Sequence, residues 1–359
     1  MRTRDLSSHP RIQFGSTPLE DAKIQSLLTD RRRFLRTGLS LAATAAFHPH
    51  LLYSSQPSWR EPVASSQTLS IAYSTIQLDF GEGALDLSHD AIASWVRRAV
   101  EAVATYYGRF PVATARILVL PSSGRGVRGG TTWGNVGGSP AFTRIHLGEH
   151  TTQQQLTDDW MLTHELIHYA LPNLPDENHW LEEGTAVYVE PIARVQSGQL
   201  DEKSVWADMI RDMPQGNPDR GDRGLDHTPT WARTYWGGAG FCLLADIELR
   251  KQSRNHIGLQ QALRAIVNAG GTINHDWRID RTLAVADEAT STEVLTQLYS
   301  SMSNNPVPID FNSLWTQLGI TPSGNTTVAF NAEAPLAEIR QAIFSPPDEP
   351  AKPKGPHSP

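Results

Sequence analysis

The spacing of hydrophobic and polar residues divides this chain into a mixed first half and a helical second half. Residues 69–80 (LSIAYSTIQLDF) are rich in β-branched side chains and partly alternate, which predicts a strand or an arm of a hairpin. Residues 115–121 have the apolar character of a buried strand, and residues 141–149 alternate like a strand with one polar face. Residues 88–108, between the first and the second of these predicted strands, have helical periodicity and a serine in position to cap the start of the helix.

Helical periodicity dominates after residue 150. One apolar run, which contains WMLTHELIHYAL, predicts a helix over about 153–171 that Pro172 ends, and a second helix starts near residue 180. The polar residues 212–230 are typical of a surface loop. Further helices are predicted over residues 233–252, 257–269, 280–288, 292–303 and 311–318. This order of elements predicts an α+β fold, with a small β-rich N-terminal lobe followed by a mostly helical lobe.

We expect five segments along the chain. A leader occupies residues 1–55, and the α+β N-terminal lobe occupies residues 56–150. The main helical region spans residues 151–275, and a C-terminal helical region spans residues 276–345. The Pro-rich, charged residues 346–359 are expected to be a disordered tail.

Charge and cysteine content exclude two kinds of protein. The 359 residues carry a formal net charge of −7, and residues 1–55 hold eight Lys or Arg against four Asp or Glu, so the rest is more acidic still. It has no basic stripe, and we therefore expect no nucleic-acid partner. The single cysteine, Cys242, lies in an apolar helical context and is expected to be a small core residue, so a disulfide scaffold is excluded.

The N-terminus resembles a twin-arginine export signal over about residues 30–50. The sequence DRRRFLRTGLSLAATAAF places Arg31 and Arg32 before a Phe-Leu pair and a short, weakly apolar run. That run is too short for a stable membrane anchor, and we expect cleavage within residues 44–55. The resemblance implies export to the periplasm or beyond, whereas the alternative is a basic linker before a small helix.

The helix predicted around WMLTHELIHYAL places two histidines and a carboxylate in an apolar run. His164 and His168 are four residues apart, so they lie on one helix face and can direct two nitrogens at one metal ion. Glu165 lies about 100° around the axis, where it can reach a water bound to that metal and act as a general base. The alternative is a buried polar cluster that neighbouring groups satisfy. Burial without such partners would cost about 1–3 kcal/mol for each group, and a metal ion removes that cost.

A catalytic zinc site needs a third protein ligand. The candidates downstream are His179, Glu182, Glu183 and Glu190. The segment HWLEEGTAVYVE resembles the Trp-Leu-x-Glu-Gly helix of gluzincin metallopeptidases, in which the glutamate before the glycine binds zinc. The resemblance therefore implies Glu183 as the third ligand, with its neighbour Glu182 as the runner-up.

A second segment, RTYWGGAGFCLLADIELRKQS, resembles the Tyr-x-x-Gly-Ala helix of the same clan, nearest the glycyl aminopeptidase family. The tyrosine of that family stabilises the oxyanion of the tetrahedral intermediate, which implies this role for Tyr235. The alternative for Tyr235 is core packing. The two resemblances together imply a zincin-type metallopeptidase fold with the HExxH helix at the cleft.

The implied activity is that of a zinc peptidase with one Zn²⁺ ion, acting on a peptide or protein. Two other functions stay open: a non-catalytic scaffold on the same fold, and a zinc hydrolase of a non-peptide amide. Substrate and oligomeric state also stay open. The choice between exo- and endopeptidase stays open because the Gly-x-Met-Glu-Asn segment of alanyl aminopeptidases, whose glutamate binds the substrate amino group, is absent. At that place stands a glycine-rich segment, residues 122–140, which is either a flexible loop or the edge along which a peptide lies. On such an edge we expect Gly129, Gly130, Trp133 and Gly138.

We expect that changing both Arg31 and Arg32 to Lys abolishes export of a reporter fused to residues 1–60, because the twin-arginine pathway recognises the arginine pair. Changing Arg2 and Arg4 to Lys, outside the motif, is the matched control. The measurement is the fraction of reporter found outside the cytoplasm. Undiminished export of the Arg31/Arg32 variant would contradict the assignment.

Overall fold

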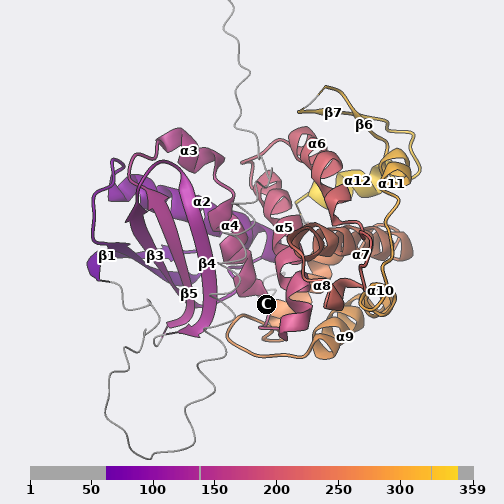
Figure 1. Cartoon of the computed structure of the whole chain (residues 1–359), viewed down its shortest axis with the longest axis horizontal. Coiled ribbons are helices and arrows are strands. Elements are labelled where there is room, and N and C mark those ends of the chain that lie inside the picture. Colours follow the sequence, from indigo (N-terminus) through magenta and orange to yellow (C-terminus); the bar gives the residue numbers. More distant parts are fainter. Residues whose placement is uncertain (1–61, 137–138, 325, 347–359) are drawn as a thin grey trace, which may run out of the picture.

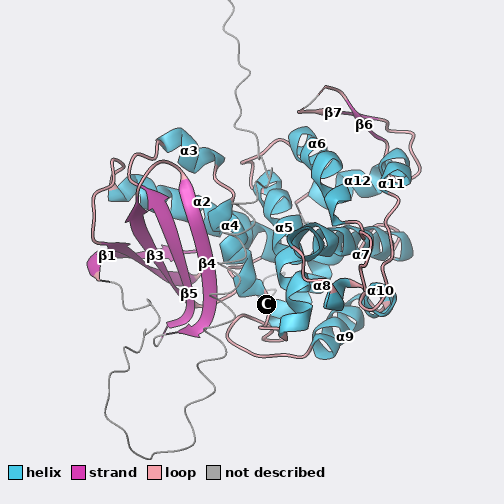
Figure 2. Ribbon diagram, viewed as in Figure 1, coloured by secondary structure: helices cyan, strands magenta, loops and turns pink. Residues whose placement is uncertain are grey.

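A five-stranded mixed sheet forms one side of the molecule, and helices form the other (Figure 1). The structure is a computed structural model that describes residues 62–136, 139–324 and 326–346. The expected export signal, its cleavage region and residues 347–359 of the expected tail lie outside the described residues, as does Gly138. The expected α+β class is confirmed (Figure 2). The segment boundaries at residues 150 and 275 stay predictions.

The sheet has the strand order β1-β2-β3-β5-β4. The central pairs β2–β3 and β3–β5 are parallel, whereas the outer pairs β1–β2 and β4–β5 are antiparallel. Helix α2 (His89–Tyr107) connects β2 to β3, and it starts at the Ser88 cap and ends at Gly108 with φ 77°, as its periodicity predicted. The strands are β1 (Val63–Ile71), β2 (Ser74–Gly81), β3 (Thr114–Ser122), β4 (Val127–Val136) and β5 (Ser139–Gly148).

Strand β4 shows that the glycine-rich segment is not a flexible loop, whereas peptide binding along it stays a prediction. Most of that segment is a regular strand at the edge of the sheet, paired with β5 along its length, and not a flexible loop. One of its glycines is required by a close approach of other backbone: a Cβ on Gly134 would overlap the carbonyl oxygen of Ile273. The composition concealed the strand because glycine has a low β-propensity, and tertiary contacts override that propensity here.

The helical part packs on α2 and on the sheet through one continuous cluster of buried apolar residues. Helices α4 and α5 lie between the sheet and α7 (Figure 1). No helix in the described ranges is long and apolar enough to cross a lipid bilayer. The α-helices after β5 are α3 (Gln153–Asp158), α4 (Met161–Ile167), α5 (His179–Gln196), α6 (Glu202–Asp212), α7 (Gly238–Gln252), α8 (Leu259–Asn268), α9 (Ile279–Thr290), α10 (Val294–Met302), α11 (Phe311–Leu318) and α12 (Ala337–Phe344).

Shorter elements fill the connections between these helices. The polar stretch 212–230 is mostly irregular, as expected, with two short 3₁₀ turns in it. Helices α6 and α12 and the small two-stranded sheet near the C-terminus are not among the predicted elements. The 3₁₀ turns are η2 (His168–Ala170), η3 (Asp176–Asn178), η4 (Met213–Gly216) and η5 (Leu225–His227); η6 (Arg233–Gly237) is a π-helical turn, and the small sheet pairs β6 (Ile320–Pro322) with β7 (Val328–Phe330).

The single helix predicted over 153–171 is wrong, because the chain breaks at Asp159. Asp159 has an extended backbone (ψ 134°), and its carboxylate accepts the N–H groups of Met161 and Leu162 at 3.2 and 3.1 Å. An aspartate that caps a new helix in this way competes with continuation of the preceding one. The break lets α4 start in a new direction, so Asp159 sets the orientation of the segment that carries HELIH.

Helices α5 and α7 approach each other backbone to backbone at Gly184 and Gly238. A Cβ on Gly184 would overlap the Cα of Gly238, and a Cβ on Gly238 would overlap the carbonyl oxygen of Trp180. Only glycine permits such an approach. The glycine that follows Glu183 therefore has a structural task, which is to seat α5 against the start of α7.

Asp159 makes the stability of the fold depend on pH. Burial raises the pKa of Asp159 from 3.8 to about 6, although the two backbone N–H groups and Trp95 favour its charged form. Because the pKa of Asp159 is higher in the folded than in the unfolded state, its protonated form stabilises the fold. This contribution to the free energy of unfolding is complete below pH 4 and is lost as the pH rises through 6. We expect Asp159→Asn to abolish this loss, so the free energy of unfolding of wild type relative to the variant falls by up to about 3 kcal/mol between pH 4 and 7. Urea denaturation at several pH values measures the free energy of unfolding of both proteins. A difference between them that does not change with pH would contradict the prediction.

Candidate metal centre

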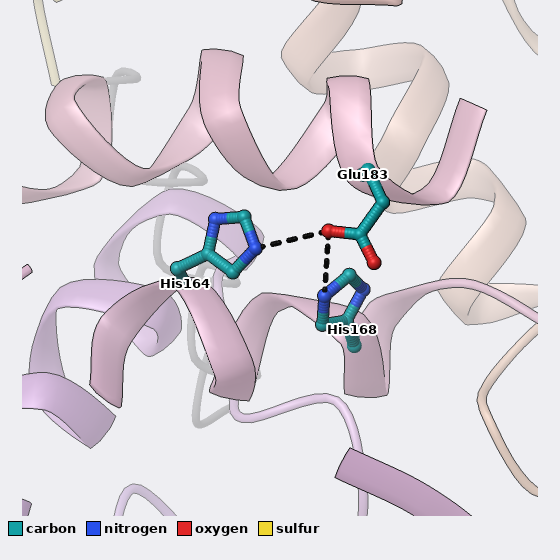
Figure 3. Close-up of side chains that lie close together, drawn as sticks. All are labelled: His164, His168 and Glu183. Carbon is teal, nitrogen blue, oxygen red and sulfur yellow. Dashed lines mark hydrogen bonds and ion pairs between the residues drawn. The ribbon is translucent and has the colours of Figure 1, made fainter. Parts of the chain in front are cut away.

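Two imidazoles and one carboxylate converge between α4 and α5 (Figure 3). His164 comes from α4, His168 follows that helix directly, and Glu183 faces them from α5. The Nε2 atoms of His164 and His168 lie 3.2 and 3.5 Å from the same oxygen, Oε2 of Glu183. All three side chains are buried, with relative exposures of 4–6%. The structure thus brings together the residues that the HELIH spacing and the Trp-Leu-x-Glu-Gly resemblance indicated.

The spacing of these atoms fits a zinc ion. Donors at about 2.0–2.1 Å around a tetrahedral zinc lie roughly 3.3–3.4 Å from one another. The observed separations of 3.2 and 3.5 Å match this value. Within the described part of the chain, these residues are the group of His, Cys, Asp or Glu side chains whose potential ligand atoms all lie within 4.8 Å of one another. Two imidazoles and a carboxylate are a donor set that zinc takes in catalytic sites.

The electrostatics keep the carboxylate charged. Burial alone would raise the pKa of Glu183, but the charge of His168 and hydrogen bonds from the surrounding histidines lower it well below its ordinary range. Burial also opposes protonation of His164, yet the hydrogen bond and charge of Glu183, aided by nearby glutamates, raise its pKa. A carboxylate that stays ionised is the form that binds a cation.

The other candidate ligands lie outside this group. His179 contacts Glu182 and the second oxygen of Glu183. Glu182, the runner-up ligand, is turned toward His179 and accepts the N–H of Leu174 at 3.3 Å. Glu190 forms a buried ion pair with Arg194 at 2.9 Å. Adjacent helical residues point about 100° apart, which explains why Glu183 faces His164 and His168 and Glu182 does not.

Glu165 is held by a chain of hydroxyl groups that the sequence did not reveal. Its Oε2 accepts a hydrogen bond of 2.7 Å from Thr132 on β4. Thr132 lies 2.9 Å from the hydroxyl of Thr143, which lies 2.6 Å from that of Tyr169. Because a carboxylate only accepts and each hydroxyl has one hydrogen, the donors run from Tyr169 through Thr143 and Thr132 to Glu165. The chain fixes one oxygen of Glu165 and leaves Oε1 for other partners.

Gly130 on β4 provides the space for Glu165. A Cβ at this position would lie 2.7 Å from Cγ and 3.0 Å from Oε1 of Glu165, and 3.0 Å from Cδ1 of Ile145. The neighbouring Gly129 has no atom within 4 Å of such a Cβ. That both glycines line a substrate edge stays a prediction. Gly130 in addition accommodates the candidate base, Glu165.

Tyr235 lies beside the group on the π-helical turn before α7. Its ring stacks nearly parallel to that of His164, with centroids 6.2 Å apart, and against Trp231 at 5.8 Å. The turn is anchored by Arg233, which forms an ion pair of 2.7 Å with Asp222. π-helical turns are frequent at functional sites because they redirect side chains within a helix. The structure therefore brings Tyr235 beside the imidazole of His164, which core packing alone does not require.

A cavity of about 100 Å³ adjoins His164 on the side of α6. Most of its wall is apolar, and its three carboxylates are paired with arginines: Glu190 with Arg194, and both Asp208 and Asp212 with Arg211. The apolar part of the wall comes from Trp160, Val187, Pro191, Leu200, Val205, Met209, Met213 and Trp236.

No protein-family model and no curated protein matches this sequence. Among solved structures, the chain is similar to an aminopeptidase N family protein from Idiomarina loihiensis, with 15% identity, a TM-score of 0.55 and coverage of 76% of this chain and 53% of that chain. An M1 zinc metallopeptidase from Deinococcus radiodurans matches at 17% identity and a TM-score of 0.43 over 69% of this chain and 54% of that one. This chain thus spans about half the length of the structures it matches. Its fold is similar to that of the aminopeptidase N family protein.

We expect Gly130→Ala to destabilise the protein by about 1–3 kcal/mol, because the added methyl group overpacks against Glu165. Gly129→Ala, one residue away on the same strand, is the matched control and should change stability by less than about 0.5 kcal/mol. Chemical denaturation measures both.

A double-mutant cycle identifies the cause of this loss. Combining Gly130→Ala with Glu165→Ala should remove most of the loss, because the shortened side chain leaves room for the methyl group. An equal loss with and without Glu165 would contradict the contact.

Proposed function

We propose that this chain is a zinc-dependent peptidase of the gluzincin type. The observation that carries the proposal is the convergence of His164, His168 and Glu183 at zinc-ligand spacing, with Glu165 next to His164 on α4. A fold similar to that of an aminopeptidase N family protein supports it. The class of reaction is hydrolysis of a peptide bond by water.

The proposed zinc ligands are Nε2 of both histidines and Oε2 of Glu183. Zinc bound by such a set supplies Lewis acidity, which polarises a carbonyl group and makes water more acidic. Burial of all three ligands limits access of bulk water and strengthens these electrostatic effects.

Glu165 is the proposed general base. One of its oxygens accepts from Thr132, so the other is available to take a proton from the attacking water. A bond forms between the water oxygen and the carbonyl carbon, and the carbon–nitrogen bond then breaks. The proton that Glu165 accepted passes to the leaving amine, so the carboxylate is ionised again after each turnover. The donor chain from Tyr169 keeps its orientation constant.

Tyr235 is the proposed donor to the oxyanion. The negative charge develops on the former carbonyl oxygen, and a phenol O–H directed there stabilises the transition state more than the ground state. Its stacking beside His164 supports this role, because it puts the side chain next to a proposed ligand.

The edge strand β4 is the proposed binding surface for the peptide backbone. It is the last strand of the sheet, so one of its sides has no strand neighbour within residues 62–136, 139–324 and 326–346. An extended peptide can add to such an edge by main-chain hydrogen bonds. Gly130 lies next to Glu165, so a peptide paired with β4 at this position would have its backbone close to the proposed base.

We expect Glu165→Gln to lower kcat for peptide cleavage by about 10²- to 10⁴-fold while the variant keeps its zinc, because the amide cannot accept the proton. Glu149→Gln, a change on a half-exposed side chain outside the site, is the matched control. Cleavage of a mixed peptide library, mapped by mass spectrometry, is the measurement. Cleavage at the parent rate by Glu165→Gln, or wild-type cleavage unaffected by a zinc chelator, would refute the proposal.

A further inference from the structure

His179, the first residue of α5, lies between two carboxylates and is not one of the three described residues whose potential ligand atoms all lie within 4.8 Å of one another. Its Nδ1 is 2.8 Å from Oε2 of Glu182, and its Nε2 is 3.2 Å from Oε1 of Glu183. The side chain is buried, with a relative exposure of 9% for the residue. The offsets of three and four residues place both glutamates on the helix face that His179 occupies.

The two oxygens of Glu183 therefore have different partners. Oε2 faces His164 and His168, as Figure 3 shows, whereas Oε1 faces His179. A carboxylate whose second oxygen is held in this way offers one oxygen to a metal and cannot turn about its last bond. Carboxylates only accept hydrogen bonds, so Nδ1 of His179 donates to Glu182, while its Nε2 lies at ion-pair distance from Oε1 of Glu183.

Glu182 anchors His179 from the other side. Its Oε2 accepts from His179, and its Oε1 accepts the backbone N–H of Leu174 at 3.3 Å. Leu174 belongs to the short connection between the HELIH segment and α5. The contacts thus run from the backbone of that connection through Glu182 and His179 to Glu183, and they couple the two segments that carry the proposed ligands.

We infer that His179 is a positioning residue that fixes Glu183 as a one-oxygen zinc ligand, with Glu182 as its anchor. The inference rests on the proposed zinc site. It gives Glu182, the neighbour of the ligand, a task that does not involve the metal. Groups that hydrogen-bond to a metal ligand orient it, and their loss lowers metal affinity by about 10- to 100-fold.

The test is the zinc affinity of the full chain, measured by competition with a chromophoric chelator at one pH. We expect His179→Ala to bind zinc about 10- to 100-fold more weakly than wild type. His179→Gln should recover part of this loss, because its amide N–H can still donate to Glu183. His256→Ala, a change at an exposed histidine, is the matched control and should bind as wild type does.

Cobalt(II) in place of zinc gives a second measurement that packing does not affect. If Glu183 gains a second metal–oxygen bond when His179 is removed, the coordination number rises and the visible absorption of cobalt weakens. We expect this weakening in His179→Ala and its partial reversal in His179→Gln. The melting temperature of the metal-free proteins reports whether each variant is folded.

The outcomes separate this inference from the proposed function. Equal zinc affinity and equal cobalt spectra in wild type and both His179 variants would overturn the positioning role and leave the zinc site intact. An equal loss of zinc affinity in His179→Ala and His179→Gln, with both metal-free proteins destabilised, would also overturn the positioning role. It would show that His179 acts only through packing. Zinc binding that is absent in wild type, or unchanged in His164→Ala, would refute the zinc site itself.

Discussion

The buried carboxylate of Glu183 is the constraint around which this structure is arranged. A charged group that is 5% exposed is stable only where partners replace its lost hydration. Three histidines surround it, two on one oxygen and one on the other. This requires α5 to lie directly against the HELIH segment. The glycine crossing of α5 with α7 supports that placement and brings the π-helical turn with Tyr235 to the same point.

The residues nearest the proposed metal could be predicted because helix geometry is local. His164 and His168 share a face by virtue of their four-residue spacing. Helix geometry allows only one of Glu182 and Glu183 to face the metal, and the resemblance to the Trp-Leu-x-Glu-Gly helix indicated Glu183. The main alternation and periodicity signals likewise predicted α2 and the α+β class. Each of these features is encoded within a few turns of one element.

The surroundings of Glu165 could not be predicted, since they come from a strand far away in the sequence. Thr132 donates to Glu165 across 33 residues, and Gly130 on the same strand leaves room for the Glu165 side chain. Glycine-rich composition even argued against a strand at β4. The break at Asp159 was missed for a different reason. The apolar periodicity of the surrounding residues continues across it and predicts one helix, whereas the signal for a new helix is a single capping aspartate.

The central claim is that His164, His168 and one oxygen of Glu183 hold zinc, and X-ray absorption at the zinc edge of the metal-loaded full chain tests it most directly. The account predicts a shell of nitrogen and oxygen donors at about 2.0–2.1 Å that includes two imidazoles, one of which disappears in His168→Ala. A shell of oxygen donors alone, or one that His168→Ala leaves unchanged, would contradict it.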